Sequence, residues 1–151
     1  MNIEIERSGP QLTESDVADF EETTERRIPE AYRAFLLAHN GGSPTPRNFT
    51  ITREEQEESV AIKRLLGIGM AERTLDIAYV LQAFSDRVPE AFFPIARDPG
   101  GNIVGIVDGG EGAGRVLYFD LDDESDEGET PLERMYLVAE SFEEFIDGLT
   151  E

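Results

Sequence analysis

The densest group of side chains that could do chemistry lies in the last third of the chain. Seven of the ten residues in 120–129 are acidic, and no basic residue interrupts them. Carboxylates in such number could bind a hard cation, act in pairs as acid and base, or contact a basic protein. Tyr118 lies just before this stretch, and Tyr is enriched at the hot spots of protein interfaces.

A calcium loop is the most specific of these possibilities, and the spacing does not fit it. Counting from Asp122, the acidic residues Glu124 and Asp126 take the third and fifth positions, and Glu133 takes the twelfth. The sixth position, where the sharp turn of such a loop requires Gly, is Glu127. Paired carboxylates for glycoside hydrolysis need a defined separation in a cleft, which abundance alone does not indicate. We therefore expect no metal site and no cofactor.

Two interpretations of the acidic stretch remain. Like charges repel one another and extend the chain, which predicts a solvated loop. Such blocks also serve as interaction segments, which predicts a surface for a basic protein. Because side chains alternate along a strand, we expect Tyr118 to point away from the inward-facing Phe119 and to be exposed. The candidate partner-binding residues are therefore Tyr118, Asp120, Asp122, Asp123, Glu124, Asp126, Glu127 and Glu129.

Other motifs with catalytic potential have structural explanations. Nucleophilic catalysis needs a nucleophile beside a positioned base, usually His. The single His39 lies at the end of a predicted helix, where it can pack and stabilise free carbonyl groups. The Gly-rich run 109–114 lacks the Lys-Ser/Thr pair of a phosphate-binding loop, and the nearby Asp108 and Glu111 would repel phosphate. This run predicts a hairpin turn, and we expect a protein that is not an enzyme.

Composition supports a protein partner and argues against other classes. The 33 acidic and 13 basic residues give a formal charge of −20, which speeds approach to basic proteins and opposes binding to nucleic acid or anionic membranes. Lys63 is the single Lys, so a general acidic, Lys-poor bias of the source proteome is a second explanation of the charge. The oligomeric state is not indicated.

The chain predicts one cytoplasmic domain. It has 151 residues without a break in composition, which suits a single domain over 1–151. There is no Cys, which suits a reducing compartment. The first residues lack the basic and apolar regions of a signal peptide, and no apolar run approaches the roughly 20 residues that span a bilayer.

The elements that must position these residues are helices toward both ends and strands between them. Apolar spacing and capping residues predict helices over 13–24, 29–39, 74–84 and 141–149. Alternation predicts strands over 49–52, 60–65, 92–96, 103–107, 116–119 and 135–139, with a rigid loop at 43–46 and an acidic turn at 54–58. We expect an α+β fold: a mainly antiparallel sheet of about five to six strands, flanked by two N-terminal helices, a middle helix and a C-terminal helix.

Four segments in this order resemble the motifs of the SUKH superfamily, which includes fungal cell-wall-assembly regulators and many bacterial immunity proteins. The segment 28–42 resembles its N-terminal signature, 93–102 its central hairpin, 116–120 the strand that follows, and 137–145 its C-terminal strand and helix. The structural residues of these motifs are Pro29, Tyr32, Phe35, Leu36, Asn40, Gly41, Gly42, Pro94, Ile95, Ala96, Gly101, Asn102, Ser141, Phe142 and Phe145.

The resemblance implies a non-enzymatic α+β domain that binds another protein. For bacterial members that partner is typically a toxin domain, often a nuclease, so the resemblance implies an immunity protein that neutralises a basic toxin. A regulatory or scaffold module for an endogenous protein is the alternative. The chain departs from relatives that carry an aromatic-Asp-His-Glu cluster, because Leu121 and Asp122 follow Phe119 and Asp120 here.

Overall fold

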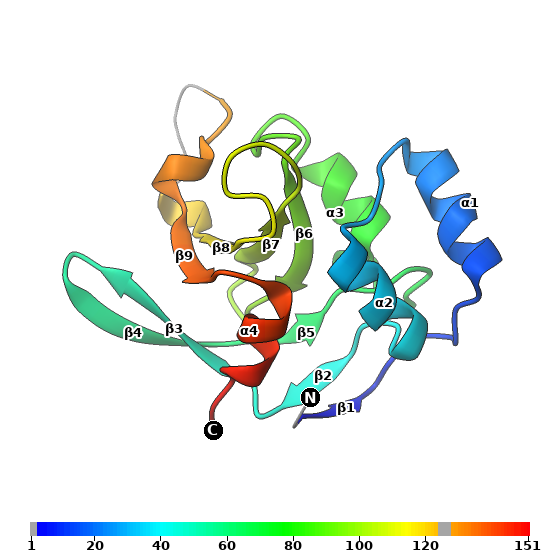
Figure 1. The fold of residues 1–151 in the computed structure, drawn as a ribbon, viewed down its shortest axis with the longest axis horizontal. Coiled ribbons are helices and arrows are strands. Elements are labelled where there is room, and N and C mark those ends of the chain that lie inside the picture. The colour runs from blue at the N-terminus through cyan, green and yellow to red at the C-terminus, as the bar shows by residue number, and fades with distance from the viewer. Residues whose placement is uncertain (1–2, 124–127) are drawn as a thin grey trace.

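The computed structural model describes residues 3–123 and 128–151 and has four α-helices among them (Figure 1). The helices are α1 (Glu14–Thr24), α2 (Glu30–Ala38), α3 (Ile77–Ala83) and α4 (Phe142–Asp147). Short 3-10 helices cover Arg73–Leu75, Leu121–Asp123 and Leu132–Arg134. The predicted α+β class and the four helix positions are confirmed.

The main sheet is antiparallel and has five strands in the order β5-β6-β7-β8-β9. Along the chain, β6, β7, β8 and β9 follow one another, and each pairs with the next. The strands are β5 (Arg64–Leu65), β6 (Phe92–Arg97), β7 (Ile103–Val107), β8 (Val116–Phe119) and β9 (Tyr136–Ala139). The Gly-rich run 109–114 forms the turn between β7 and β8, as predicted, and Gly114 N donates to Val107 O.

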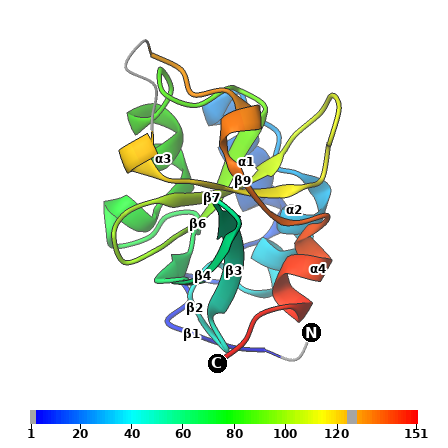
Figure 2. The same ribbon diagram turned by 90° about the vertical axis from the view of Figure 1, so that its left-hand side faces the viewer.

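Two small antiparallel pairs accompany this sheet. β3 (Asn48–Arg53) pairs with β4 (Gln56–Ala61) in a hairpin, and β1 (Glu4–Glu6) pairs with β2 (Ser43–Thr45). The β3–β4 hairpin extends away from the side of the molecule that carries α1 (Figure 1), and Figure 2 shows it from its own side.

Three local predictions were wrong. Residues 43–46 are not simply a rigid loop, because Ser43–Thr45 pairs with β1. Pro44 is tolerated in this short two-stranded pair, since Pro is compatible with edge strands. The turn at 54–58 is only two residues long, and the strand resumes at Gln56. The single strand predicted over 60–65 is two strands, the end of β4 and the short β5.

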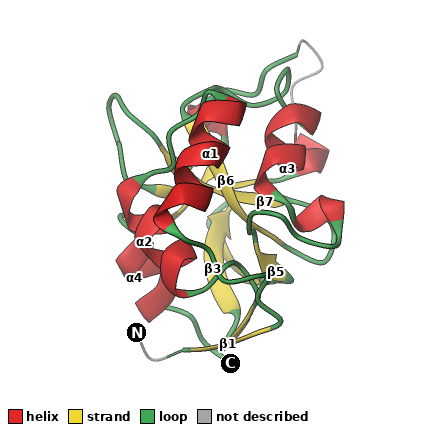
Figure 3. Ribbon diagram, turned by 90° about the vertical axis from the view of Figure 1, so that its right-hand side faces the viewer, coloured by secondary structure: helices red, strands yellow, loops and turns green. Residues whose placement is uncertain are grey.

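The main sheet is the middle layer of the molecule. Tyr118 and Phe119 are neighbours in β8 and point to opposite faces. Phe119 contacts Phe92 on the face where Val80 of α3 and the C-capping Phe84 lie. Tyr118 contacts Phe49 of β3, which in turn contacts Phe145 of α4. Figure 3 shows α1, α2 and α3 together on the side opposite the hairpin.

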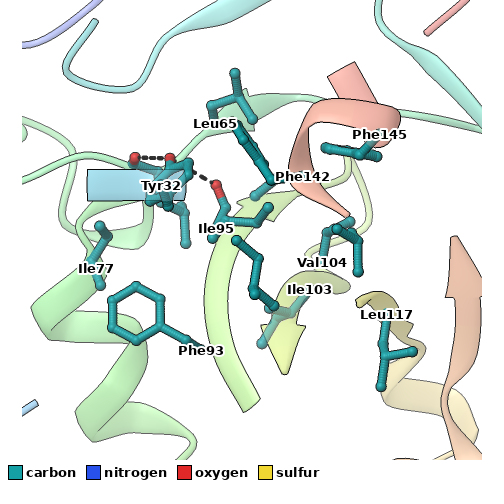
Figure 4. Close-up of a cluster of buried hydrophobic side chains, with 14 of the residues drawn as sticks. Tyr32, Leu65, Ile77, Phe93, Ile95, Ile103, Val104, Leu117, Phe142 and Phe145 are labelled. Carbon is teal, nitrogen blue, oxygen red and sulfur yellow. Dashed lines mark hydrogen bonds between the residues drawn. The ribbon is translucent and has the colours of Figure 1, made fainter. Parts of the chain in front are cut away.

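One continuous apolar core joins the layers, and aromatic rings form its centre near α2 and α4 (Figure 4). The Tyr32 ring lies edge-on to Phe142 and is stacked with Phe35. The five Phe side chains of the motif segments are buried: Phe35, Phe93, Phe119, Phe142 and Phe145.

Candidate functional site

Arg53 is the cation around which the acidic residues are arranged. It ends β3, where every second side chain faces the body of the molecule, and it follows the buried Phe49 and Ile51 on that face. One guanidinium donates to three carboxylates: Nε to Glu58 Oε2 at 2.6 Å, Nη1 to Asp123 Oδ2 at 2.9 Å, and Nη2 to Asp120 Oδ2 at 2.8 Å.

The carboxylates around Arg53 are held on several sides. Asp120 Oδ1 accepts from the backbone N–H of Asp122, and Asp123 Oδ2 also accepts from the Tyr136 hydroxyl at 2.6 Å. The Arg53 guanidinium lies 4.7 Å from the centre of the Tyr136 ring. The hydrogen bond to Asp120 raises the pKa of Arg53, and the hydrogen bond to Asp123 is the main cause that raises the pKa of Tyr136. Both groups therefore keep their protons at neutral pH.

A second hydrogen-bond network, built on Asp98 and Asn102, holds the start of the acidic stretch in place. The Tyr118 hydroxyl donates to Asp98 Oδ2 at 2.6 Å, and Asn102 donates to both carboxylate oxygens of Asp98. The side-chain oxygen of Asn102 accepts from the backbone N–H of Leu121 at 2.8 Å. The β6–β7 turn is thereby tied to the segment after β8. Burial, followed by the hydrogen bond to Asp98, raises the pKa of Tyr118.

The two networks separate the candidate partner-binding residues into those that are buried or paired and those that are exposed. Tyr118 is 3 % exposed, so the expectation of an exposed side chain is wrong: Phe49 covers its ring and Asp98 takes its hydroxyl. Asp120 is 9 % exposed and Asp123 is paired, so both belong in part to the framework of the fold. Asp122 and Glu129 are exposed. Glu124, Asp126 and Glu127 lie outside the described residues.

The β3–β4 hairpin contributes acidic residues that the sequence analysis treated only as a turn. Glu54, Glu55, Glu57 and Glu58 are all exposed. Because Arg53 binds both Glu58 and Asp123, the hairpin and the segment 120–123 lie side by side. We call the resulting acidic region the acidic face and define it by Glu54, Glu55, Glu57, Glu58, Asp122 and Asp123, with Glu57 on the side of the hairpin opposite Glu58.

The signal for the acidic face was present in the sequence, but it was divided between two segments 60 to 70 residues apart. The run 53–58 has one Arg and four Glu, with a Gln at its centre. The long-range pairing of Arg53 with residues 120 and 123 joins it to the later stretch. That pairing depends on β3 lying beside β9, which no local pattern indicates.

The acidic face can attract positively charged groups. In the described ranges, no group of three or more His, Asp or Glu side chains is arranged to hold a metal ion. Between Glu58, Asp120 and Asp123 the chain places the guanidinium of Arg53 instead. Arg134 donates to the backbone oxygen of Asp123, at 3.4 Å. The acidic face therefore keeps an excess of carboxylates that can attract a basic group.

The motif residues of the first half lock α2 to the strands. The Tyr32 hydroxyl donates to the backbone oxygens of Leu66 and Ile95 (Figure 4). The buried Asn40 donates to the oxygens of Pro10 and Ile68 and accepts from Ile68 N. Pro29 precedes the first residue of α2, and Phe35 and Leu36 are buried in the core.

Two glycines of this segment are required by backbone conformation. Gly41 has φ of 69°, and a Cβ there would lie 2.7 Å from the backbone oxygen of Leu65. Gly42 has φ of 123°, and its N–H donates to Leu65 O. The chain therefore turns sharply after α2 and passes closely over β5.

The motif residues of the second half shape the sheet and its last helix. Pro94, Ile95 and Ala96 lie at an irregularity in the β6–β7 register, and Gly101 adopts φ of 89° in the turn that Asn102 closes. Ser141 caps α4, because its hydroxyl accepts from Glu144 N at 3.0 Å. Phe142 and Phe145 fix that helix in the core.

His39 has the structural position that the sequence predicts. It caps the C-terminal end of α2, its backbone N–H donates to Phe35 O at 2.6 Å, and its ring lies 5.6 Å from the Phe35 ring.

In the part of the chain that the structure describes, no helix is both long and apolar enough to cross a bilayer.

The fold and the acidic face together define a small α+β domain whose distinctive chemistry lies on its surface, as in a binding domain. The chain belongs to the SMI1 / KNR4 family (SUKH-1), because the model of that family matches residues 11–148. This match covers nearly the whole chain and includes all four motif segments. Members of the family are in general non-enzymatic domains that bind proteins. No curated protein matches the sequence.

Proposed function

We propose that this protein is an immunity protein of the cytoplasm, which neutralises a toxin by binding a basic domain of it. Two observations support the proposal. The family is associated with toxin immunity and with cell-wall regulation. The acidic face offers six carboxylates on two adjoining segments, the hairpin tip and the turn after β8.

The acidic face is the single observation that carries the proposal. Its carboxylates would attract a basic toxin domain and orient it during the encounter. If the toxin is a nuclease, its nucleic-acid groove is electropositive, and the carboxylates would occupy the positions of phosphates. Arg53 holds the carboxylates of Glu58 and Asp123 in place, so these two side chains lose little freedom on binding.

A regulatory or scaffold module that binds an endogenous basic protein is the second candidate. The association of the family with cell-wall regulation supports it. The acidic face serves either function equally well, because both require a protein partner of opposite charge. The two functions differ in the consequence of losing the partner contact: death by intoxication for one, and a growth or morphology defect for the other.

Co-expression with the product of the adjacent reading frame tests the proposal. We expect that reading frame to arrest growth when expressed alone, and we expect this chain to restore growth and to co-purify with its product in equal amounts. A variant with Glu54, Glu55 and Glu57 changed to Gln should rescue less well. Rescue without a stable complex, or no rescue by a folded protein, would refute immunity by direct binding.

A further inference from the structure

The outer edge of β4 presents a row of backbone N–H and C=O groups. The hydrogen bond from Ile62 N to Arg47 O fixes which residues of the hairpin exchange bonds, and such pairs alternate along an antiparallel ladder. By this count, Glu57 and Ser59 direct their N–H and C=O groups away from β3. In the part of the chain that the structure describes, no group pairs with them there.

β4 carries two charged side chains, Glu57 and Glu58, but it lacks the other features that protect a sheet edge. Those features are Pro, bulges, Lys residues, a very short strand or a covering element. The six residues Gln56–Ala61 keep an unbroken register with β3, contain no Pro and no Lys, and are exposed over the first four positions. By contrast, β9 has an irregular register and lies beside β3, and Leu65 of β5 is bridged by Gly42.

We propose that β4 is a docking edge for an extended segment of a basic protein, which adds to the hairpin as a third strand. This inference rests on the proposed function, because it specifies how the same partner is bound. Glu57 and Ser59 would form the new main-chain hydrogen bonds. Glu57 and Glu58 point to opposite faces of the hairpin, so Lys or Arg side chains of the added strand would meet a carboxylate on each face.

Charge decides against a second copy of this chain as the occupant. Pairing of two β4 edges would bring Glu57 and Glu58 of one copy beside acidic residues of the other, and like charges opposite each other destabilise a sheet. The formal charge of −20 on each copy adds repulsion at longer range. Lys or Arg side chains of a basic strand would instead be attracted to these carboxylates, and the main-chain hydrogen bonds of that strand would add to the attraction.

Amide hydrogen exchange distinguishes strand addition from plain electrostatic binding in the unmodified protein. The probe is a short synthetic peptide of alternating Lys and Val. We expect exchange at Glu57 and Ser59 to slow by about tenfold or more, as for newly bonded amides. The amides of Glu58 and Val60 already face β3, so we expect little change there. Equal protection at all four amides, or peptide binding without protection, would overturn strand docking and leave the proposed function standing.

Substitution of Ser59 supplies the matched test. Ser59→Pro removes the outward N–H and obstructs an incoming strand, while the ladder to β3 keeps its bonds. We expect it to weaken peptide binding about tenfold, and Ser59→Ala to leave binding within about twofold. If Ser59→Pro does not fold, Glu57→Pro replaces it and is compared with Glu57→Gln, which loses the same charge but keeps the outward N–H. The proposal would be overturned by equal binding of the Pro and control variants, by absence of peptide binding, or by a dimer that Ser59→Pro abolishes. The co-expression experiment tests the immunity function separately.

Discussion

At the scale of single residues, Arg53 connects parts of the molecule that are distant in sequence. Its three donating nitrogens bind Glu58 in the same hairpin and Asp120 and Asp123 after β8. Asp120 is almost enclosed, so this carboxylate depends on Arg53 for its compensating charge. Arg53 therefore both supports the fold and limits how much negative charge the acidic face presents.

We predict that Arg53→Gln lowers the free energy of unfolding by about 2 kcal/mol, because charged hydrogen bonds to a poorly solvated carboxylate are lost. Urea denaturation at neutral pH measures the change. Arg47→Gln is the control, since Arg47 is exposed and makes no ion pair in the described structure, and it should change stability by less than about 0.5 kcal/mol. Equal effects of the two substitutions would contradict the role given to Arg53.

The tyrosines predict a loss of stability in alkaline solution. Burial raises the pKa of Tyr32 and Tyr118 in the folded chain. The unfolded value is about 10, so the folded chain binds more protons in the window above it. The stability that these phenols contribute is complete below about pH 10 and is lost as the pH rises further. We expect the free energy of unfolding to fall progressively as the pH rises above about 10.

Tyr118→Phe identifies the contribution of one tyrosine to this slope. At neutral pH the substitution should cost about 1–2 kcal/mol, because Asp98 loses a hydrogen-bond donor inside the protein. Above about pH 10 the variant should lose stability less steeply than the parent chain. A Tyr118→Phe variant with the full parent slope would show that another group titrates.

At the scale of elements, the two-residue turn of the β3–β4 hairpin has a backbone conformation that is unfavourable for its residues. Glu54 and Glu55 have φ of 51° and 67°, the conformation in which Asn and Gly are favoured in two-residue hairpins. Side chains other than Gly and Asn adopt it at a cost of about 1 kcal/mol each. The hairpin thus places two carboxylates at its tip against the local preference of the backbone.

We predict that replacing Glu54 by Asn and Glu55 by Gly raises the free energy of unfolding by about 1 kcal/mol. Under the proposed function, the same variant should bind its basic partner more slowly, because two charges of the acidic face are removed. Thermal unfolding and association kinetics measure the two effects. A variant that is more stable and binds at the parent rate would show that the tip does not take part in recognition.

The helices and most strands were predictable from sequence because their signals are local. Thr13 and Ser141 cap helices at the positions that their sequence contexts indicate. Pairings between distant segments were not predictable. Glu4–Glu6 has no pattern of its own and becomes a strand only beside Ser43–Thr45. Tyr118 alternates with Phe119 as expected, yet both faces of β8 are covered, because β3 and α4 pack on the side expected to be open.

At the scale of the whole molecule, the charge of −20 acts through its distribution as well as its size. Acidic residues also lie on α1 and α4, so the acidic face is one part of a negative surface. A general acidic bias would make all of these charges equivalent. A function in binding makes the charges of the acidic face more important for association than equal numbers elsewhere.

Two charge-matched variants separate these explanations. One changes Glu54, Glu55 and Glu57 to Gln, and the control changes Asp19 to Asn, Glu22 to Gln and Asp147 to Asn at exposed positions of α1 and α4. Each removes three charges from −20 and leaves −17. We expect the first to slow association with the co-purified partner by about tenfold at low salt, and the control by less than about twofold.

The dependence of the association rate on ionic strength is a second test of the same variants. Raising salt from about 0.05 to about 0.5 M should slow association of the parent chain steeply and remove most of the difference between the two variants, because exposed charges are then screened within a few ångströms. Dissociation should change much less, since it depends on short-range contacts. Equal association rates of the two variants at low salt would show that the acidity of this chain is a general bias and that its partner is recognised by another surface.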